Sequence, residues 1–282
     1  MKFTTLFSLT LLAGLGLAGC SKDSSSDTQG NAKLEVRLTD APGDFSRVSL
    51  DVQQIEVHLK DENDPKGWQF LPFTPQAINV LDYVNGRSAL LVSTDFAAGD
   101  LKEIRLILGP NSTVTTRDGE VYALKTPSGQ SSGVKLKLDK VSLRQRETFQ
   151  LLLDFDVAKS IVERGNWKPG NDKKERFLLK PVIRLVAQDV AGGLYGQVTP
   201  AAALPQILAI RSSLTPADTF STSADATGAF KLQALPSGTY RVEFYPTTVA
   251  PINQPAYQTV TRSGVVVTNN QATDMSQISL LK

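Results

Sequence analysis

Alternation of apolar and polar residues with a period of two dominates the chain from residue 33 onward. In the run 34–38, apolar residues alternate with charged ones, as the side chains on the two faces of a strand do. Two further alternating runs, 48–52 and 55–59, are out of phase across Gln53-Gln54, which predicts a β-bulge there. Further strands are expected over residues 103–108, 134–138, 148–155 and 176–186. This pattern predicts an all-β protein.

Turn-forming residues separate these runs. The turns are expected at Pro42-Gly43-Asp44, Asp64-Pro65-Lys66-Gly67, Asn85-Gly86 and Arg117-Asp118-Gly119. Short strands at such spacing favour an antiparallel sandwich or barrel. One short helix is expected at Val157–Arg164, directly after a predicted strand. Pro181 has no amide proton to donate, so we expect it to mark an edge or a bulge in the 176–186 strand.

The distribution of charge divides the chain. Residues 33–187 carry 23 Lys and Arg and 21 Asp and Glu, whereas residues 188–282 carry only five of each kind. Together with Ala191-Gly192-Gly193, this shift predicts a domain boundary near residue 190. Beyond it, Asp225 to Gly228 predicts a hairpin turn, and Tyr240 and Val242 are expected to face a core. We therefore predict two antiparallel β-sandwich domains, at residues 33–187 and 193–282.

The first 19 residues have the features of an export signal. Lys2 precedes an uncharged, mostly apolar run from Leu6 to Leu17, which is shorter than the roughly 20 residues that span a bilayer. The segment Leu17-Ala18-Gly19-Cys20 resembles the bacterial lipobox. That resemblance implies cleavage before Cys20, diacylglycerol on its sulfur and acylation of the new amino group. Residues 20–32 are then expected to form a flexible tether, because residues 21–31 contain no aliphatic or aromatic side chain.

The predicted lipid anchor makes the membrane the first expected partner. Cys20 is the only cysteine, so no intramolecular disulfide can form. More than one acyl chain, including a palmitate-type amide, gives stable anchoring. Ser21 stands where enteric lipoproteins often carry the aspartate that retains them in the inner membrane. By that resemblance, we expect the protein to be located in the cell envelope, and at the outer membrane if the cell has one.

Two family resemblances follow from ordered motifs. Residues 33–186 resemble a bacterial family of unknown function found on lipoproteins, family DUF4382. The motifs that carry this resemblance are Leu38-Thr39-Asp40-Ala41-Pro42-Gly43-Asp44, Ile55-Glu56-Val57-His58, Val80-Leu81-Asp82, Leu153-Asp154-Phe155-Asp156 and Leu179-Lys180-Pro181-Val182-Ile183-Arg184. In residues 193–282, the motifs at 225–230 and 235–242 resemble carboxypeptidase regulatory-like and transthyretin-like sandwiches. The first family has no established activity, so it implies a fold and an envelope setting but no chemistry.

Composition argues against several function classes. The net charge is +2 and no basic block stands out, so nucleic acid is not an expected partner. The one histidine, His58, lies on the opposite face of its run from Ile55 and Val57, and we expect it at the surface. A catalytic triad or a zinc site based on histidine would have to use it. No Gly-x-Ser-x-Gly elbow and no P-loop occurs. We predict no catalytic residue and no cofactor.

Carboxylates leave one chemistry open. Asp40 and Asp44 flank the Pro-Gly turn, while Asp154 and Asp156 are two apart on a predicted strand and so project to one face. Such residues could hold calcium, could act as acid and base in a polysaccharide hydrolase, or could simply cap turns and strand ends. The last interpretation is the one we expect. A hydrolase would require a deep cleft in which one carboxyl has a strongly raised pKa.

The loop 165–174 supplies a candidate contact surface. Trp167 lies there among basic residues, and it could stack on a sugar, contact a protein, or pack back on its own domain. The function that we predict is a non-enzymatic binding or scaffolding module, anchored to the envelope by lipid. Its partner would be another envelope protein or a glycan. The alternatives are a polysaccharide hydrolase that uses Asp carboxylates and a structural stalk or adhesin accessory.

Overall fold

The computed structural model describes residues 30–41, 43–59, 67–126, 133–168, 170–172, 176–211, 218–248 and 256–282. The predicted export signal, Cys20 and most of the predicted tether lie outside these residues. The first strand begins at Asn31, within the range that we assigned to the tether. Strands dominate the described residues, so the prediction of an all-β protein is confirmed. No helix among the described residues combines the length and the apolar character needed to cross a bilayer.

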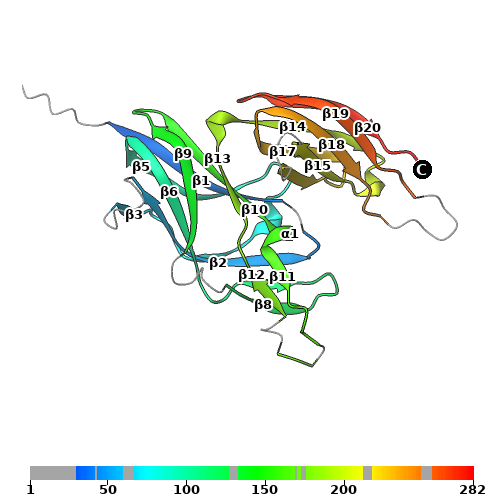
Figure 1. The fold of residues 1–282 in the computed structure, drawn as a ribbon, viewed down its shortest axis with the longest axis horizontal. Coiled ribbons are helices and arrows are strands. Elements are labelled where there is room, and N and C mark those ends of the chain that lie inside the picture. Colours follow the sequence, from blue (N-terminus) through cyan, green and yellow to red (C-terminus); the bar gives the residue numbers. More distant parts are fainter. Residues whose placement is uncertain are drawn as a thin grey trace, which may run out of the picture.

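The N-terminal unit, which we define as residues 31–187, contains two sheets (Figure 1). The smaller sheet has the strand order β13-β10-β1-β5, and the larger has β11-β12-β8-β7-β2-β6-β9, with β3 and β4 also paired with β2. The strands are β1 Asn31–Ala41, β2 Arg47–His58, β3 Trp68–Phe70, β4 Gln76–Asn79, β5 Ala89–Ala97, β6 Gly99–Leu108, β7 Thr113–Thr115, β8 Val121–Lys125, β9 Val134–Leu143, β10 Thr148–Asp156, β11 Ile161–Glu163, β12 Phe177–Leu179 and β13 Ile183–Ala187.

The C-terminal unit, residues 191–279, also contains two sheets, and it lies beside the N-terminal unit (Figure 1, yellow to red). The sheet orders are β17-β14-β20 and β16-β15-β18-β19. The strands are β14 Ala191–Thr199, β15 Gln206–Arg211, β16 Asp218–Ser223, β17 Ala229–Pro236, β18 Gly238–Tyr245, β19 Val260–Val267 and β20 Ala272–Ser279. Short helical turns connect strands in the two units: η1 Val80–Tyr83, α1 Val157–Ser160, η3 Gln188–Val190 and η4 Ala201–Ala203.

Each unit has its own apolar core. The alternation seen in the sequence places one set of side chains of each strand in that core, as on β1, where Leu34, Val36 and Leu38 are fully buried. One core is formed by residues between 32 and 187 and the other by residues between 194 and 280. Tyr240 and Val242 lie in the second core, as predicted. Burial of these side chains is the main favourable contribution to folding.

Strand pairing corrects the antiparallel prediction in part. Most pairs are antiparallel, but β1 runs parallel to β10, β8 to β12, and β14 to β20. These partners are far apart in the sequence, and neither periodicity nor turn chemistry reports which distant strands meet. The β-bulge predicted at Gln53-Gln54 is confirmed, since the register between β2 and β6 shifts between Val52 and Gln54.

The segment around Pro181 is two strands rather than one. The predicted strand over 176–186 ends as β12 at Leu179 and resumes as β13 at Ile183, in the other sheet. Pro181 lies in the break, where its missing amide proton costs no ladder hydrogen bond. Pro181 thus lies in the segment through which the chain crosses from one sheet to the other.

The helix predicted at Val157–Arg164 is twice as long as the helix in the structure. The helix α1 ends at Ser160, and β11 begins at Ile161. Ile161 and Val162 are β-branched, which favours a strand, and they pair with Leu179 and Leu178 of β12. Tertiary pairing therefore ends the helix after one turn.

The turn at Asp225–Gly228 forms, but it does not close a hairpin. The Asp225 carboxylate accepts hydrogen bonds from the amides of Thr227 (2.8 Å) and Ala229 (3.1 Å), which fixes the turn. The strands on either side, β16 and β17, belong to different sheets. The turn chemistry was thus predictable, whereas the pairing of the strands was not.

Substituting Gly228 with alanine should lower the free energy of unfolding by about 2 kcal/mol. Gly228 has a φ of +85°, and an added Cβ would lie 2.1 Å from the carbonyl oxygen of Val198. Gly264→Ala is the matched control, because Gly264 has a φ of +74° in open space. The free energy of unfolding of the control should fall by only about 1 kcal/mol, because alanine at Gly264 would be strained by the positive φ but would meet no neighbouring atom. Urea unfolding measures both, and equal losses would show that the contact with Val198 imposes no constraint.

Candidate functional site

Three of the four predicted carboxylates come together where two neighbouring strands end. The strands β1 and β10 run parallel, with Thr39 opposite Asp154 and Asp40 opposite Phe155. Asp40 therefore lies at the end of β1 beside Asp154 and Asp156, which lie at the end of β10. All three side chains are buried, with 4–6 % of their surface exposed. We call these three residues the acidic cluster.

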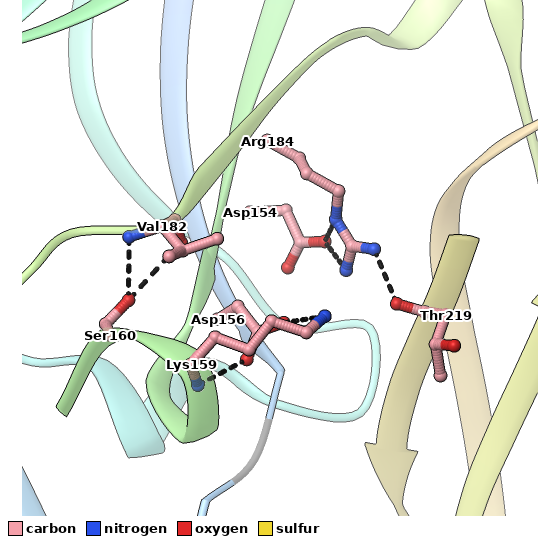
Figure 2. A network of polar contacts seen from close by, with 7 residues as sticks. All are labelled: Asp154, Asp156, Lys159, Ser160, Val182, Arg184 and Thr219. Carbon is pink, nitrogen blue, oxygen red and sulfur yellow. Dashed lines mark hydrogen bonds and ion pairs between the residues drawn. The ribbon is translucent and has the colours of Figure 1, made fainter. Parts of the chain in front are cut away.

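Arg184 connects the acidic cluster to the C-terminal unit (Figure 2). It lies on β13 directly opposite Asp154. Its Nε and Nη2 atoms donate to the same Asp154 oxygen, Oδ2, at 2.9 and 2.6 Å. Its Nη1 atom donates to the carbonyl oxygen of Thr219 on β16 at 2.8 Å, and its guanidinium carbon lies 4.0 Å from the centre of the Phe220 ring. One side chain thus pairs a buried carboxylate in one unit and binds the backbone and an aromatic face of the other.

Asp156 has a local structural role. It is the N-cap of α1: its Oδ1 accepts the Lys159 amide at 3.0 Å, and its Oδ2 pairs with the Lys159 ammonium at 2.8 Å. The Ser160 hydroxyl accepts the amide of Val182 at 2.9 Å, which holds the end of α1 against the chain entering β13 (Figure 2). These bonds fix the segment that carries Arg184.

Asp40 is the unusual member of the cluster. Among the described residues, the one group that approaches its oxygens as a donor is the Val157 amide, and that approach falls short of the geometry of a full hydrogen bond. The pKa of Asp40 is raised to about 9, mainly by burial and next by the like charge of Asp154, with a smaller contribution from Asp156 and an opposing effect of the Val157 amide. Burial likewise raises the pKa of Asp154, against the opposing effect of Arg184. At neutral pH, Asp40 is therefore a neutral carboxylic acid.

A small cavity between the units opens onto this acid. Its volume is about 20 Å³, and Asp40 and Asp154 line it together with residues that are mostly polar: Thr39, Asn85, Gly86, Ser221, Thr222, Lys231, Leu232 and Gln233. A polar cavity of this size holds one water molecule. A sugar ring does not fit into it, so the deep cleft that a hydrolase would require is not formed at the cluster.

Asn85 makes a second connection between the units. Its backbone amide donates to the Thr222 hydroxyl at 3.2 Å, and its side-chain amide donates to the Ala229 carbonyl at 3.1 Å. Its Oδ1 atom accepts the Lys231 amide. The Asn85 side chain thus bonds to the edge of β17 as a neighbouring strand would. We call the contacts of Arg184 and Asn85 with the C-terminal unit the polar joint.

Two wider, open hollows flank the polar joint. Their volumes are about 270 and 440 Å³, and both include Lys231 and Ala272. The remaining lining consists of apolar, glycine and amide residues with one exposed aromatic, Tyr195. No carboxylate lines either hollow. A pair of groups for acid and base catalysis is therefore absent from both.

The fourth predicted carboxylate lies apart from the cluster. Asp44 is at the surface and pairs with Arg117 at 2.5 Å, with the two side chains 89 % and 70 % exposed. Among the described residues, no group of three or more histidine, cysteine or acidic side chains converges to hold a metal ion. Asp40, Asp44, Asp154 and Asp156 therefore do not form a single four-carboxylate site.

Trp167 packs back on the N-terminal unit. Its ring meets Tyr122 edge-on at 6.0 Å, and the Arg176 guanidinium lies 4.7 Å from its centre. The indole Nε1 donates to the carbonyl of Asp172 at 3.3 Å. The side chain is only partly exposed, so packing against the unit accounts for its position in the loop. Binding by Trp167 stays a prediction.

The prediction that His58 lies at the surface is wrong. His58 is fully buried, and its ring lies 4.9 Å from that of Trp68, its partner across β2 and β3. Arg105 covers the Trp68 ring at 4.1 Å and also bonds to Glu56. This face of β2 is therefore covered, and alternation alone cannot distinguish a covered second face from a solvated one.

Sequence reasoning missed the residues that link the units. In the sequence, Arg184 stands out only as part of a family motif, and Asn85 only as part of an expected turn. An opposite-charge pair on two predicted strands was a usable signal for Asp154 and Arg184. Locating it required the register between β10 and β13, which the sequence does not give.

Comparison with known proteins gives one family and distant structural likenesses. The model of a family described as a domain of unknown function (DUF4382) matches residues 31–181. No curated protein matches the chain. The resemblance of residues 193–282 to carboxypeptidase regulatory-like sandwiches stays a prediction.

Solved structures match only at low TM-scores. The Bacillus anthracis TIE protein is 13% identical with a TM-score of 0.21, over 89% of this chain and 34% of that one. A leucine-rich repeat protein from Bacteroides thetaiotaomicron VPI-5482 is 11% identical with a TM-score of 0.20, over 88% and 26%. BcpA, the major pilin subunit of Bacillus cereus, is 9% identical with a TM-score of 0.25, over 89% and 99%. The chain thus spans about a third and a quarter of the first two proteins, and at these scores none of the likenesses supports a functional argument.

Proposed function

The chain belongs to the DUF4382 family, which is defined without a function, and from this premise we propose that it is a lipid-anchored, non-enzymatic scaffolding protein of the bacterial cell envelope. In this proposal, residues 33–187 and 193–282 are two β domains that the polar joint holds at a fixed angle. The observation that carries the proposal is that the Arg184 guanidinium donates hydrogen bonds to both units, to Asp154 in one and to Thr219 in the other.

The state of the carboxylates supports a role without catalysis. Asp154 is paired with Arg184, Asp156 caps α1, and Asp44 pairs with Arg117 at the surface. Asp40 has the raised pKa of a catalytic acid, but it faces a cavity of about 20 Å³. A general acid must reach the substrate within hydrogen-bond distance, and a glycoside requires two carboxyl groups across an open cleft. The alternative of a polysaccharide hydrolase therefore has no support from this geometry.

The proposed anchor rests on the amino-terminal sequence. A basic start, a short apolar run and Leu-Ala-Gly-Cys ending at Cys20 form the pattern of a lipoprotein signal, and Ser21 favours the outer membrane in a diderm cell. The partners that we propose are the membrane, through the lipid, and either an envelope protein or a glycan, on a surface that the two units share. A purely structural stalk is the alternative within the same class.

Replacing Cys20 with serine should release the protein from the membrane. Stable attachment requires more than one acyl chain, and the thiol at position 20 is the only one available to receive diacylglycerol. Cell fractionation with immunoblotting measures the location, and mass spectrometry of the parent measures the added lipid. Ser21→Ala is the control and should leave the protein membrane-bound. An unchanged membrane fraction for Cys20→Ser, or a parent of unmodified mass, would contradict the proposal.

A further inference from the structure

Tyr195 lines the larger of the two open hollows beside the polar joint. It lies on β14, the central strand of the sheet β17-β14-β20, and 41 % of its surface is exposed. Neither its hydroxyl nor its ring pairs with another residue in the described ranges. The hydroxyl of Tyr240, by contrast, donates to the Pro236 carbonyl at 2.7 Å. The Tyr195 ring is therefore available to a ligand through both its apolar face and its hydroxyl.

Lys231 adds a positive charge beside this ring. It lies directly opposite Tyr195 on β17, so the two side chains project from the same face of the sheet. Lys231 and Ala272 line both hollows, which therefore adjoin, and we call them together the double hollow. The Lys231 ammonium forms no ion pair with the part of the chain that the structure describes. Asp274, opposite Tyr195 on β20, lines neither hollow and accepts the Ser276 amide at 2.7 Å.

Four side-chain amides line the smaller hollow. They belong to Gln188, Gln233, Asn270 and Gln271, and none of them hydrogen-bonds to another described residue. Each amide offers two donor protons and an acceptor oxygen. A sugar carries hydroxyl groups that match such amides, and its ring has an apolar face that can lie on an aromatic side chain. The double hollow therefore combines the two kinds of contact that a sugar requires.

We propose that the double hollow binds a carboxylated polysaccharide segment, with Tyr195 under a sugar ring and Lys231 beside a carboxylate. This assignment rests on the proposed function, because it names the glycan as the partner on the surface that the two units share. Asn85 also lines the larger hollow, so both units contribute to the site. The hollows measure about 270 and 440 Å³, which is comparable with ligand pockets of about 300–1,000 Å³.

The shape and charge of the double hollow favour a glycan over a protein partner. Protein interfaces are broad, with about 800 Å² buried on each partner, and lysine is depleted in them. The double hollow is concave, and Lys231 is the one charged residue among the described residues that line it. With no carboxylate in that lining, an anionic ligand meets no like charge there.

Isothermal titration calorimetry of the full chain tests the proposal. A zwitterionic detergent is used, since a detergent with a sugar head group would compete for the site. The acidic probes are oligosaccharides of galacturonate, of mannuronate and of hyaluronan, and the uncharged control is a malto-oligosaccharide of the same length. We expect at least one acidic probe to bind up to about fivefold more tightly than the control at low salt. This preference should shrink as sodium chloride is added.

Variants assign the contacts. Tyr195→Ala should weaken binding about tenfold, while Tyr195→Phe, which keeps the ring, should stay within about twofold of the parent. Lys231→Gln should weaken binding of the acidic probe by up to about fivefold and leave binding of the uncharged control unchanged. Tyr245→Ala is the matched control, because Tyr245 is a 37 % exposed tyrosine on β18, outside the double hollow, and it should bind like the parent.

Several outcomes would overturn the proposal. No heat of binding with any acidic probe at about 1 mM would leave a protein as the partner of this surface. Equal affinity for acidic and uncharged probes would remove the role of Lys231. Unchanged binding in Tyr195→Ala, or an equal loss in Tyr245→Ala, would remove the role of Tyr195. The first two outcomes use the unaltered chain, so they do not depend on how a variant folds. Each failure leaves the lipid anchor intact, since fractionation of Cys20→Ser tests that part of the proposed function separately.

Discussion

Replacing Asp40 with asparagine should raise the free energy of unfolding by up to about 4 kcal/mol at pH 7. The pKa of Asp40 is about 9 in the folded chain, above the ordinary value of 3.8. The folded chain therefore holds this proton more tightly than the unfolded chain does. The contribution of Asp40 to stability is complete below about pH 4 and is lost progressively as the pH rises to about 9. Asparagine cannot ionise, so it removes this pH-dependent loss.

The pH profile is the decisive readout for Asp40. The stability advantage of Asp40→Asn over the parent should grow by about 1.4 kcal/mol per pH unit between about pH 4 and pH 9, and then level off. Urea unfolding at several pH values measures it, with Asp44→Asn as the surface control. Parallel profiles for Asp40→Asn and the parent would show that Asp40 does not carry a strongly bound proton.

Replacing Arg184 with alanine should lower the free energy of unfolding by about 3–5 kcal/mol. The change leaves Asp154, which is 6 % exposed, without its cationic partner, and it removes the bonds to Thr219 and the contact with Phe220. The pKa of Asp154, already raised by burial, loses the opposing effect of Arg184 and should rise further. The loss of stability should consequently be smaller at acid pH, where Asp154 becomes protonated.

A matched surface pair provides the control for Arg184. Arg117 pairs with Asp44, but both side chains are largely exposed. Arg117→Ala should therefore cost no more than about 1 kcal/mol. Adding Asp154→Asn to Arg184→Ala should recover part of the loss, because the buried charge is then gone. Equal effects of Arg184→Ala and Arg117→Ala, or no recovery in the double variant, would contradict the role of the buried pair.

Local patterns in the sequence predicted much of the fold. Alternation identified most of the long strands, the phase change at Gln53-Gln54 located a real bulge, and Tyr240 and Val242 reach the core. Side-chain periodicity and turn chemistry depend on neighbouring residues, so one sequence suffices to read them. The same holds for the Asp225 turn, whose hydrogen bonds lie within five residues.

The features that the sequence could not predict depend on pairing between strands that are far apart along the chain. The acidic cluster forms because β1 lies parallel to β10, more than a hundred residues later. Arg184 meets Asp154 only through the register of β13. His58 is buried because Trp68 and Arg105 cover a face that alternation suggested was open. The candidate residues Asp40, Asp154 and Asp156 were therefore identifiable, while their partners, burial and separation from Asp44 were not.

If the polar joint holds the two units at a fixed angle, the distance between the units should have a single value that depends on Arg184. Spin labels can be placed by V121C on β8 and V266C on β19, both of which are exposed at 54 % and 58 %, in a Cys20→Ser background that has no other thiol. Double electron–electron resonance should give one narrow distance distribution, which broadens when Arg184→Ala is added. A distribution that is already broad without that change, or one that Arg184→Ala leaves unaltered, would contradict a fixed angle held by Arg184.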